Sequence, residues 1–428
     1  MLDDTLLDDP AALQRADHDR ALLALAGSGA RVRTALRLAD AAGLDRLRPD
    51  GRPRAVLVAG HGSALTAAEM LAALAGTASL VAPLPPTDAE PVPRPDRATA
   101  PAAFTAGLAW QLPGWAGPLD LLVISSAGGG ERGLVALAEQ AYARGCAIVV
   151  TAPGGSPLAE AALQVRALPL PFVPSAVEPA EPGLPGGPGP AAEPDLPAED
   201  PAALWAHLAP LLALTQKLGV TQLAYDALPL TADLLDAAAV RCRPDAAAYT
   251  NPAKGLAARL AGTLPLLWAE GPVAGAAAAR FAAQLADRAG RPALAGLLPQ
   301  VLTAHRGMFT GQLGAGADPD DFFRDRVDEP DPLHLQVLLL RHVPGEAAGG
   351  PSGSGATGED DGGPAEVPAD DAGPRSFGAV RAHRLAAAHD VRLTEYAARR
   401  PDPLHALVDL VALTDFAAVY LGLAAARS

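Results

Sequence analysis

Apolar residues along this chain follow two alternating periods, and each period predicts a different element. Short continuous apolar runs predict buried strands, and apolar residues three or four positions apart predict helices. In the first part of the chain the runs predict strands at 55–59, 78–82, 120–124, 146–151 and 165–170, and the helical period predicts helices at 11–45, 64–75 and 131–144. Strands that alternate with helices form a largely parallel sheet. We therefore expect an α/β domain in residues 1–170.

The later part of the chain repeats this plan. Strands are predicted at 264–269, 292–294, 333–342 and 388–394, and helices at 201–218, 231–242, 252–262, 274–288, 296–304 and 403–425. The fold class is therefore α/β, with a second domain of similar architecture in residues 201–428 and helical elements between two mostly parallel sheets.

Two segments interrupt the pattern, at 171–200 and 344–374, and both are rich in Pro, Gly, Ala and acidic residues. Such a composition cannot bury enough apolar surface to offset the entropy of folding. We expect a mobile linker between the domains at 171–200 and a disordered insertion in the second domain at 344–374.

The net charge and the cysteine content exclude some classes of function. The net charge of −15 argues against a nucleic-acid partner, because a phosphate backbone needs a basic face. This net charge is also typical of a cytoplasmic protein, because repulsion between molecules of like charge keeps a protein soluble. The two cysteines, Cys146 and Cys242, form no CxxC pattern, so we expect no disulfide framework and no metal site. The acidic N-terminus lacks the basic and apolar regions of a signal peptide, so we expect none. Pro, Gly or charged residues interrupt the apolar stretches before they reach a membrane-spanning length, so we expect no membrane contact.

A strand, a glycine turn and a helix follow one another at Arg54–Glu69, with the turn at Gly60-His61-Gly62-Ser63. This order brings unpaired N–H groups and the positive end of a helix dipole to one small volume, where an anion such as phosphate binds. Leu65 stands where a dinucleotide site has its third glycine, and no acidic residue ends a following strand as a ribose contact would require, so we expect no nicotinamide cofactor. The absence of GKS or GKT excludes a P-loop.

The same order recurs at 120–144, with the turn running from Ser125 and Ser126 through Gly128 to Gly130. Candidate ligand-binding groups are therefore Gly60, Gly62, Ser63, Ser125, Ser126 and Gly128. A glycine turn in an α/β protein also serves simply to reverse the chain, so the structural alternative stays open for each turn taken alone.

Asp287, near the end of the helix predicted at 274–288, and His305 are the candidate catalytic groups. A carboxylate and an imidazole beside a phosphate-binding turn suit sugar-phosphate isomerisation. One group opens the sugar ring, and the other moves a proton between C1 and C2. The alternatives are a solvated surface aspartate and a histidine that caps a helix.

Several segments together resemble the bifunctional phosphoglucose/phosphomannose isomerases of the sugar isomerase (SIS) domain superfamily. They are Asn251-Pro-Ala-Lys-Gly-Leu-Ala257, the Arg280-Phe281 pair leading to Asp287, Leu298-Pro-Gln with His305, and the segment from Leu410 to Gly422. The resemblance implies two tandem SIS-type, flavodoxin-like domains in a homodimer. It also implies interconversion of glucose 6-phosphate or mannose 6-phosphate with fructose 6-phosphate, with no cofactor.

Within this resemblance His305 matches the family's ring-opening histidine, and Gly60, Gly62, Ser63 and Ser125 match part of its sugar-phosphate site. Departures concern the chemistry. Asp287-Arg288 replaces the family's Glu-Asn pair, and Ala127 and Gly130 replace two residues that carry hydroxyls in the family. Leu158 replaces an arginine, and the family's terminal segment with an active-site lysine has no counterpart before Ser428. The shorter base matters, because a displacement of about 1 Å can cost roughly 100-fold in rate.

The leading hypothesis is aldose–ketose isomerisation of a hexose 6-phosphate, with Asp287 as base and His305 as ring-opening acid/base. One alternative is a regulatory protein that binds a sugar phosphate and keeps the SIS fold without turnover. Another is a purely structural α/β protein with no ligand.

Overall fold

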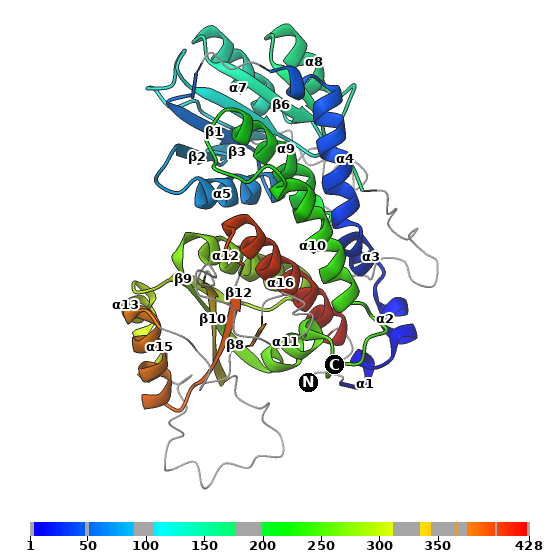
Figure 1. Ribbon diagram of the computed structural model, residues 1–428, viewed down its shortest axis with the longest axis vertical. Helices are drawn as coiled ribbons and strands as arrows, with labels where there is room; N and C mark the ends of the chain where they lie inside the picture. The colour runs from blue at the N-terminus through cyan, green and yellow to red at the C-terminus, as the bar shows by residue number, and fades with distance from the viewer. Residues whose placement is uncertain are drawn as a thin grey trace, which may run out of the picture. The chain divides into compact units, whose positions relative to one another are not determined.

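The computed structural model describes residues 4–47, 51–89, 107–175, 199–310, 334–343, 365–366, 375–398 and 400–425. They form two compact units (Figure 1): the first-sheet unit, residues 17–236, and the second-sheet unit, residues 1–16 and 237–428. The division falls within α10 (Ala227–Arg241), so α9 (Ala203–Lys217) belongs with the first sheet, whereas the sequence analysis assigned it to the second domain. Most of the expected linker and insertion lies outside the described residues.

The first-sheet unit is built on five parallel strands in the order β2-β1-β5-β6-β7. The strands are β1 (Ala55–Ala59), β2 (Leu80–Leu84), β5 (Leu121–Ser125), β6 (Ala147–Ala152) and β7 (Leu168–Pro171), beside a small antiparallel pair, β3 (Asp88–Ala89) and β4 (Leu108–Ala109). The helices are α3 (Ala21–Ala26), α4 (Ser28–Ala41), the short η1 (Leu44–Arg46), α5 (Ser63–Ala75), α7 (Arg132–Ala143), α8 (Pro157–Gln164) and α9. The sheet predicted from the alternating pattern is confirmed.

Helices cover both faces of this sheet (Figure 1). Side chains of α7 and α8 pack with Leu57, Leu122, Ile124 and Val150 in one core, and α4, α5 and α9 lie on the opposite face. The strand order reverses between β1 and β5, which pair with Ala59 opposite Ile124. In sheets of this kind ligands bind at the carboxyl ends of the strands where the order reverses.

The second-sheet unit has the order β11-β12-β10-β8-β9, parallel except for β11. Its strands are β8 (Thr263–Glu270), β9 (Leu294–Leu297), β10 (His334–His342), β11 (Ala365–Glu366) and β12 (Arg392–Ala398). Its helices are α1 (Asp4–Leu7), α2 (Pro10–Ala16), α11 (Pro252–Leu260), α12 (Gly271–Ala289), α13 (Val301–Ala304), α14 (Arg306–Thr310), α15 (Phe377–Ala388) and α16 (Pro403–Ala425). Helices α11, α12 and α16 lie on one face, and α13, α14 and α15 on the other (Figure 1).

Helix α16 is long and apolar enough to cross a membrane by length and composition, which the sequence analysis did not expect. In this unit 89% of its apolar window is buried, so it packs as a core helix. Its Asp415 forms a buried ion pair with Arg280 of α12, and each side chain is only 2% exposed. Charged groups in such a helix are tolerated where they are paired.

Lys254 of α11 is also fully buried. Its Nζ donates hydrogen bonds to the carbonyl oxygens of Leu7 at 2.6 Å, Pro244 at 2.7 Å and Ala246 at 2.7 Å. The side-chain oxygen of Asn251 caps the same helix by accepting from the N–H groups of Ala253 and Lys254. The Asn-Pro-Ala-Lys segment therefore connects α11 to α1 through the hydrogen bond between Lys254 and Leu7.

Candidate functional site

The first glycine turn joins β1 to α5 as predicted. A Cβ on Gly60 would meet the Ser125 carbonyl oxygen at 2.8 Å, so this position requires glycine for β1 and β5 to approach. Gly62 has φ +54°, a backbone conformation that favours glycine, and directs the chain into α5 at Ser63.

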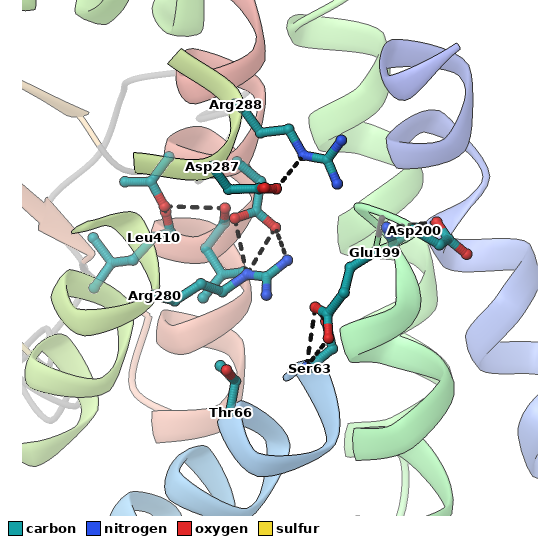
Figure 2. Close-up of polar contacts among 12 residues, drawn as sticks. Ser63, Thr66, Glu199, Asp200, Arg280, Asp287, Arg288 and Leu410 are labelled. Atoms are coloured by element: carbon teal, nitrogen blue, oxygen red, sulfur yellow. Dashed lines mark hydrogen bonds and ion pairs between the residues drawn. The ribbon is translucent and has the colours of Figure 1, made fainter. Parts of the chain in front are cut away.

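A carboxylate occupies the position at which a phosphate was expected. The Ser63 N–H lies 3.0 and 3.1 Å from the two oxygens of Glu199, and the Ser63 hydroxyl donates to Oε2 at 2.7 Å (Figure 2). A side chain at Gly62 would collide with this carboxylate. The turn at the N-terminus of α5 therefore binds an oxyanion, and in this structure the oxyanion belongs to the protein itself.

The second glycine turn folds around the hydroxyl of Ser126. Ser126 Oγ accepts hydrogen bonds from the N–H groups of Gly128 at 3.2 Å and Gly129 at 2.7 Å, and donates to the carboxylate of Glu131 at 2.7–2.8 Å. These two amides therefore already have an acceptor within the turn. Glu131, at the start of α7, is 2% exposed.

Glu131 also contacts the first turn. The Nε2 of His61 lies 3.0 Å from Glu131 Oε1, and the His61 side chain is 23% exposed. Burial raises the pKa of Glu131, but hydrogen bonds from His61 and Ser126 outweigh that effect and lower it below its ordinary value. The result is an ionised, buried carboxylate that joins the two turns at the edge where β1 and β5 end.

Ser125 turns its hydroxyl toward the interior. It lies 2.7 Å from Nδ1 of His207 on α9, and both side chains are buried. Burial, with smaller contributions from Arg31 and His61, lowers the pKa of His207 to about 3, so its ring is neutral. The pair fixes β5 against α9 and exposes neither group to solvent.

The two predicted catalytic residues lie in the second-sheet unit, on opposite faces of its sheet. Asp287 is 58% exposed near the end of α12 and lies 2.9 Å from its neighbour Arg288 (Figure 2). Helix α12 starts at Gly271, directly after the carboxyl end of β8. Asp287 lies 16 residues further along this helix, which is about 24 Å, and so lies toward the amino ends of the strands.

His305 lies between α13 and α14 on the other face. Its Nδ1 accepts a hydrogen bond of 3.1 Å from the indole N–H of Trp268, and burial lowers its pKa. The structure therefore does not bring Asp287 and His305 together within one chain, and their catalytic roles remain predictions.

One segment of the chain matches the model of a known protein family. Residues 249–340 match the family model of the bacterial phospho-glucose isomerase C-terminal SIS domain. The matched residues lie within the second-sheet unit, which is therefore similar to a SIS domain of the phosphoglucose isomerase type. A search of curated proteins finds no match.

Two solved structures are similar to nearly the whole chain at the level of the fold. A hypothetical protein from Thermus thermophilus aligns over 98% of this chain and 89% of its own, with 13% identity and a TM-score of 0.56. A glucose-6-phosphate isomerase from Chlamydia trachomatis aligns over 99% and 80%, with 12% identity and a TM-score of 0.55.

The second SIS domain carries an ion network where its own strand order reverses. Arg341 of β10 pairs with Glu270 at the end of β8 and with Glu395 of β12, and Glu395 lies 3.0 Å from His383 Nε2. The Arg341 side chain is 5% exposed, so these carboxylates neutralise it internally. Among the described residues, no group of three or more His, Cys, Asp and Glu is placed to hold a metal ion.

Glu395 makes the stability of this domain depend on pH. Burial raises its pKa, but hydrogen bonds from His383 and Arg341 outweigh burial and lower it from 4.5 to about 2. Its ionised form therefore stabilises the fold above pH 4.5, and that stabilisation is lost as pH falls toward 2.

We expect the difference in unfolding free energy between wild type and Glu395→Gln to shrink by about 3 kcal/mol across this interval. Urea denaturation at several pH values measures it. An equal difference at about pH 6 and about pH 2 contradicts this assignment.

Four polar groups of the first-sheet unit were not predicted from the sequence: His61, Glu131, Glu199 and His207. The glycine turns that position His61 and Glu131 were recognised. A histidine within one turn and a glutamate ending the other were a local signal that could have been used. Glu199 lies 136 residues from Ser63, in a Pro- and Glu-rich stretch that offers no such signal.

Proposed function

We propose that the first SIS domain binds the phosphate of a hexose 6-phosphate at Ser63 and that the protein interconverts aldose and ketose forms of that sugar. The observation that supports this most directly is the Glu199 carboxylate on the Ser63 N–H and hydroxyl. A phosphate group presents the same acceptor oxygens with greater charge, and it binds helix N-termini through the same donors. The matched family model and the position between β1 and β5 agree with a sugar-phosphate ligand.

Under this proposal the ligand phosphate displaces Glu199. The substrates would be glucose 6-phosphate or mannose 6-phosphate with fructose 6-phosphate, and the protein would act as a cytoplasmic homodimer without a cofactor, as the resemblance and the composition imply. The second candidate is a sugar-phosphate-binding regulator. Two observations favour it: Glu199 occupies the position proposed for the phosphate, and Ala127 and Gly130 stand where the family that the sequence resembles has hydroxyl side chains.

A coupled assay with glucose 6-phosphate and mannose 6-phosphate, combined with calorimetric titration of the same ligands, separates the candidates. Turnover supports the isomerase. Binding without turnover supports the regulator, and the absence of both contradicts the proposed ligand. Asp287→Asn and His305→Gln in the same assay test the roles predicted for these residues.

Glu199→Gln is expected to bind the sugar phosphate more tightly than wild type. Hydrogen bonds to an ionised acceptor are roughly twice as strong as neutral ones, so an amide competes less well for Ser63. We expect about a tenfold decrease in Kd, equivalent to about 1.4 kcal/mol.

Calorimetric titration with fructose 6-phosphate measures this change, and Glu139→Gln on the exposed side of α7 is the matched control. Unchanged or weaker binding in Glu199→Gln argues against phosphate at Ser63.

A further inference from the structure

His61 and Glu131 form an imidazole–carboxylate pair at the edge proposed to bind the ligand. His61 belongs to the turn after β1, and Glu131 follows the turn after β5. Because β1 and β5 are neighbours where the strand order reverses, the pair lies at the end of the sheet where α/β proteins of this kind bind ligands. Trp110 holds the first turn in place, since its indole N–H donates to the carbonyl oxygens of Leu84 at 3.1 Å and Gly60 at 3.3 Å.

The carboxylate determines which ring nitrogen is basic. Glu131 is buried, ionised and within 3.0 Å of Nε2, so Nε2 carries the proton and donates it to Glu131. The lone pair is then on Nδ1, for which the described residues provide no hydrogen-bond partner. A carboxylate that fixes the tautomer of a histidine and stabilises its charged form is the arrangement by which proteins produce a general base.

The pair is also accessible from one side. The carboxylate is 2% exposed, whereas the imidazole is 23% exposed. The base can therefore meet a ligand while its partner stays shielded from water, which strengthens the interaction between them.

We propose that His61, in place of Asp287, is the catalytic residue that moves the proton between C2 and C1, and that Glu131 is its positioning residue. This inference rests on the proposed function. With an open-chain aldose phosphate, Nδ1 of His61 removes the proton from C2, the C–H electron pair forms the C1–C2 double bond, and the carbonyl oxygen takes a proton from solvent to give an enediol. The imidazolium then returns its proton to C1 while the C2 hydroxyl loses its own to solvent. C2 is thereby oxidised and C1 reduced, with no external oxidant.

The spacing along the turn fits this step. His61 is two residues before Ser63, a separation of at most about 7 Å along an extended chain. A ligand whose phosphate replaces the Glu199 carboxylate at Ser63 would place its carbon chain beside the same short turn. The phosphate site and the proton-transfer site are thus parts of one element.

His61→Gln tests the proposal with little change in shape. The glutamine amide can still donate to Glu131, but it has no basic nitrogen. The measurement is deuterium incorporation at C1 of fructose 6-phosphate in D₂O, followed by NMR, together with kcat and KM in the coupled assay. Calorimetric titration of each variant reports binding separately, and His334→Gln, an exposed histidine on β10, is the matched control.

We expect His61→Gln to lose about 100- to 10,000-fold in kcat and in exchange rate while the Kd for fructose 6-phosphate changes by less than about threefold. Glu131→Gln should also lower kcat with KM nearly unchanged, and Glu131→Asp should recover part of the loss. A His61→Gln rate within about threefold of wild type overturns the proposal, as does wild-type protein that binds the sugar phosphate without exchanging C1. Failure of wild type to bind at all contradicts the proposed function instead.

Discussion

Asp415→Ala is expected to destabilise the second-sheet unit by about 3–5 kcal/mol, the usual cost of removing one partner from a buried ion pair. Arg280 donates from Nε at 2.9 and 3.0 Å and from Nη2 at 2.8 Å to the Asp415 carboxylate. Without Asp415 the guanidinium stays buried and loses its main compensating charge. Helices α12 and α16, which this pair connects, would lose a contact in the centre of their interface.

Urea denaturation followed by tryptophan fluorescence and circular dichroism measures this effect. Asp287→Ala is the matched control, because the Asp287 side chain is 58% exposed on the same helix and its ion pair should contribute less than about 1 kcal/mol. The double variant Arg280→Met with Asp415→Leu should recover much of the loss, since well-packed apolar residues can replace a buried pair. Equal effects of Asp415→Ala and Asp287→Ala contradict this account.

The fold was predictable wherever one local pattern dominated. The strand at 55–59 is confirmed at both ends, because five apolar residues lie between Arg54 and Gly60. The last helix, 403–425, is also confirmed, because Pro403 favours a helix start and the residues after it are mostly apolar, with Asp409 and Asp415 the charged exceptions.

The pattern failed after the second Pro- and Gly-rich segment. The strand predicted at 388–394 was wrong in position: the helix α15 ends at Ala388, and β12 occupies Arg392–Ala398. Alanine, histidine and arginine in α15 give a weak helical period, and its start depends on Ser376, whose hydroxyl accepts from the Ala379 N–H. One capping residue beside a low-complexity segment is weaker evidence for a helix than a complete alternating pattern is for a strand, so the helix was not predicted.

The sequence predicted the two backbone turns of the candidate site but not the side chains that meet there. Both glycine turns follow from local spacing, but their partners come from distant positions: Glu131 is 70 residues from His61, and His207 is 82 from Ser125. Such pairs form when strands and helices pack, and no short motif in one sequence specifies them. The sequence therefore indicates where an anion can bind, while tertiary packing determines that Glu199 binds there and that His61 meets a carboxylate.

Lys254 illustrates how a motif used for recognition can be structural. Its three N–H donors are all used by backbone carbonyls, and its Nζ lies 5.6 Å from the centroid of the Tyr420 ring. Burial lowers the pKa of this amine, so part of the favourable energy of these hydrogen bonds is offset by desolvation. The remaining interactions connect α11 and α16 to the N-terminal Leu7.

We expect Lys254→Met to destabilise the second-sheet unit by about 3 kcal/mol, because three carbonyls lose a charged donor and methionine offers none. The only other lysine, Lys217, donates to the Asp45 carbonyl oxygen at the surface, so Lys217→Met should change stability by less than about 0.5 kcal/mol. Urea denaturation compares the two variants.

Amine-reactive labelling read by mass spectrometry gives a second measurement on the wild-type protein. Lys217 should react in the folded state and Lys254 only when the unit unfolds. Rapid labelling of Lys254 under native conditions, or equal stability of the two variants, contradicts a structural role for the buried amine.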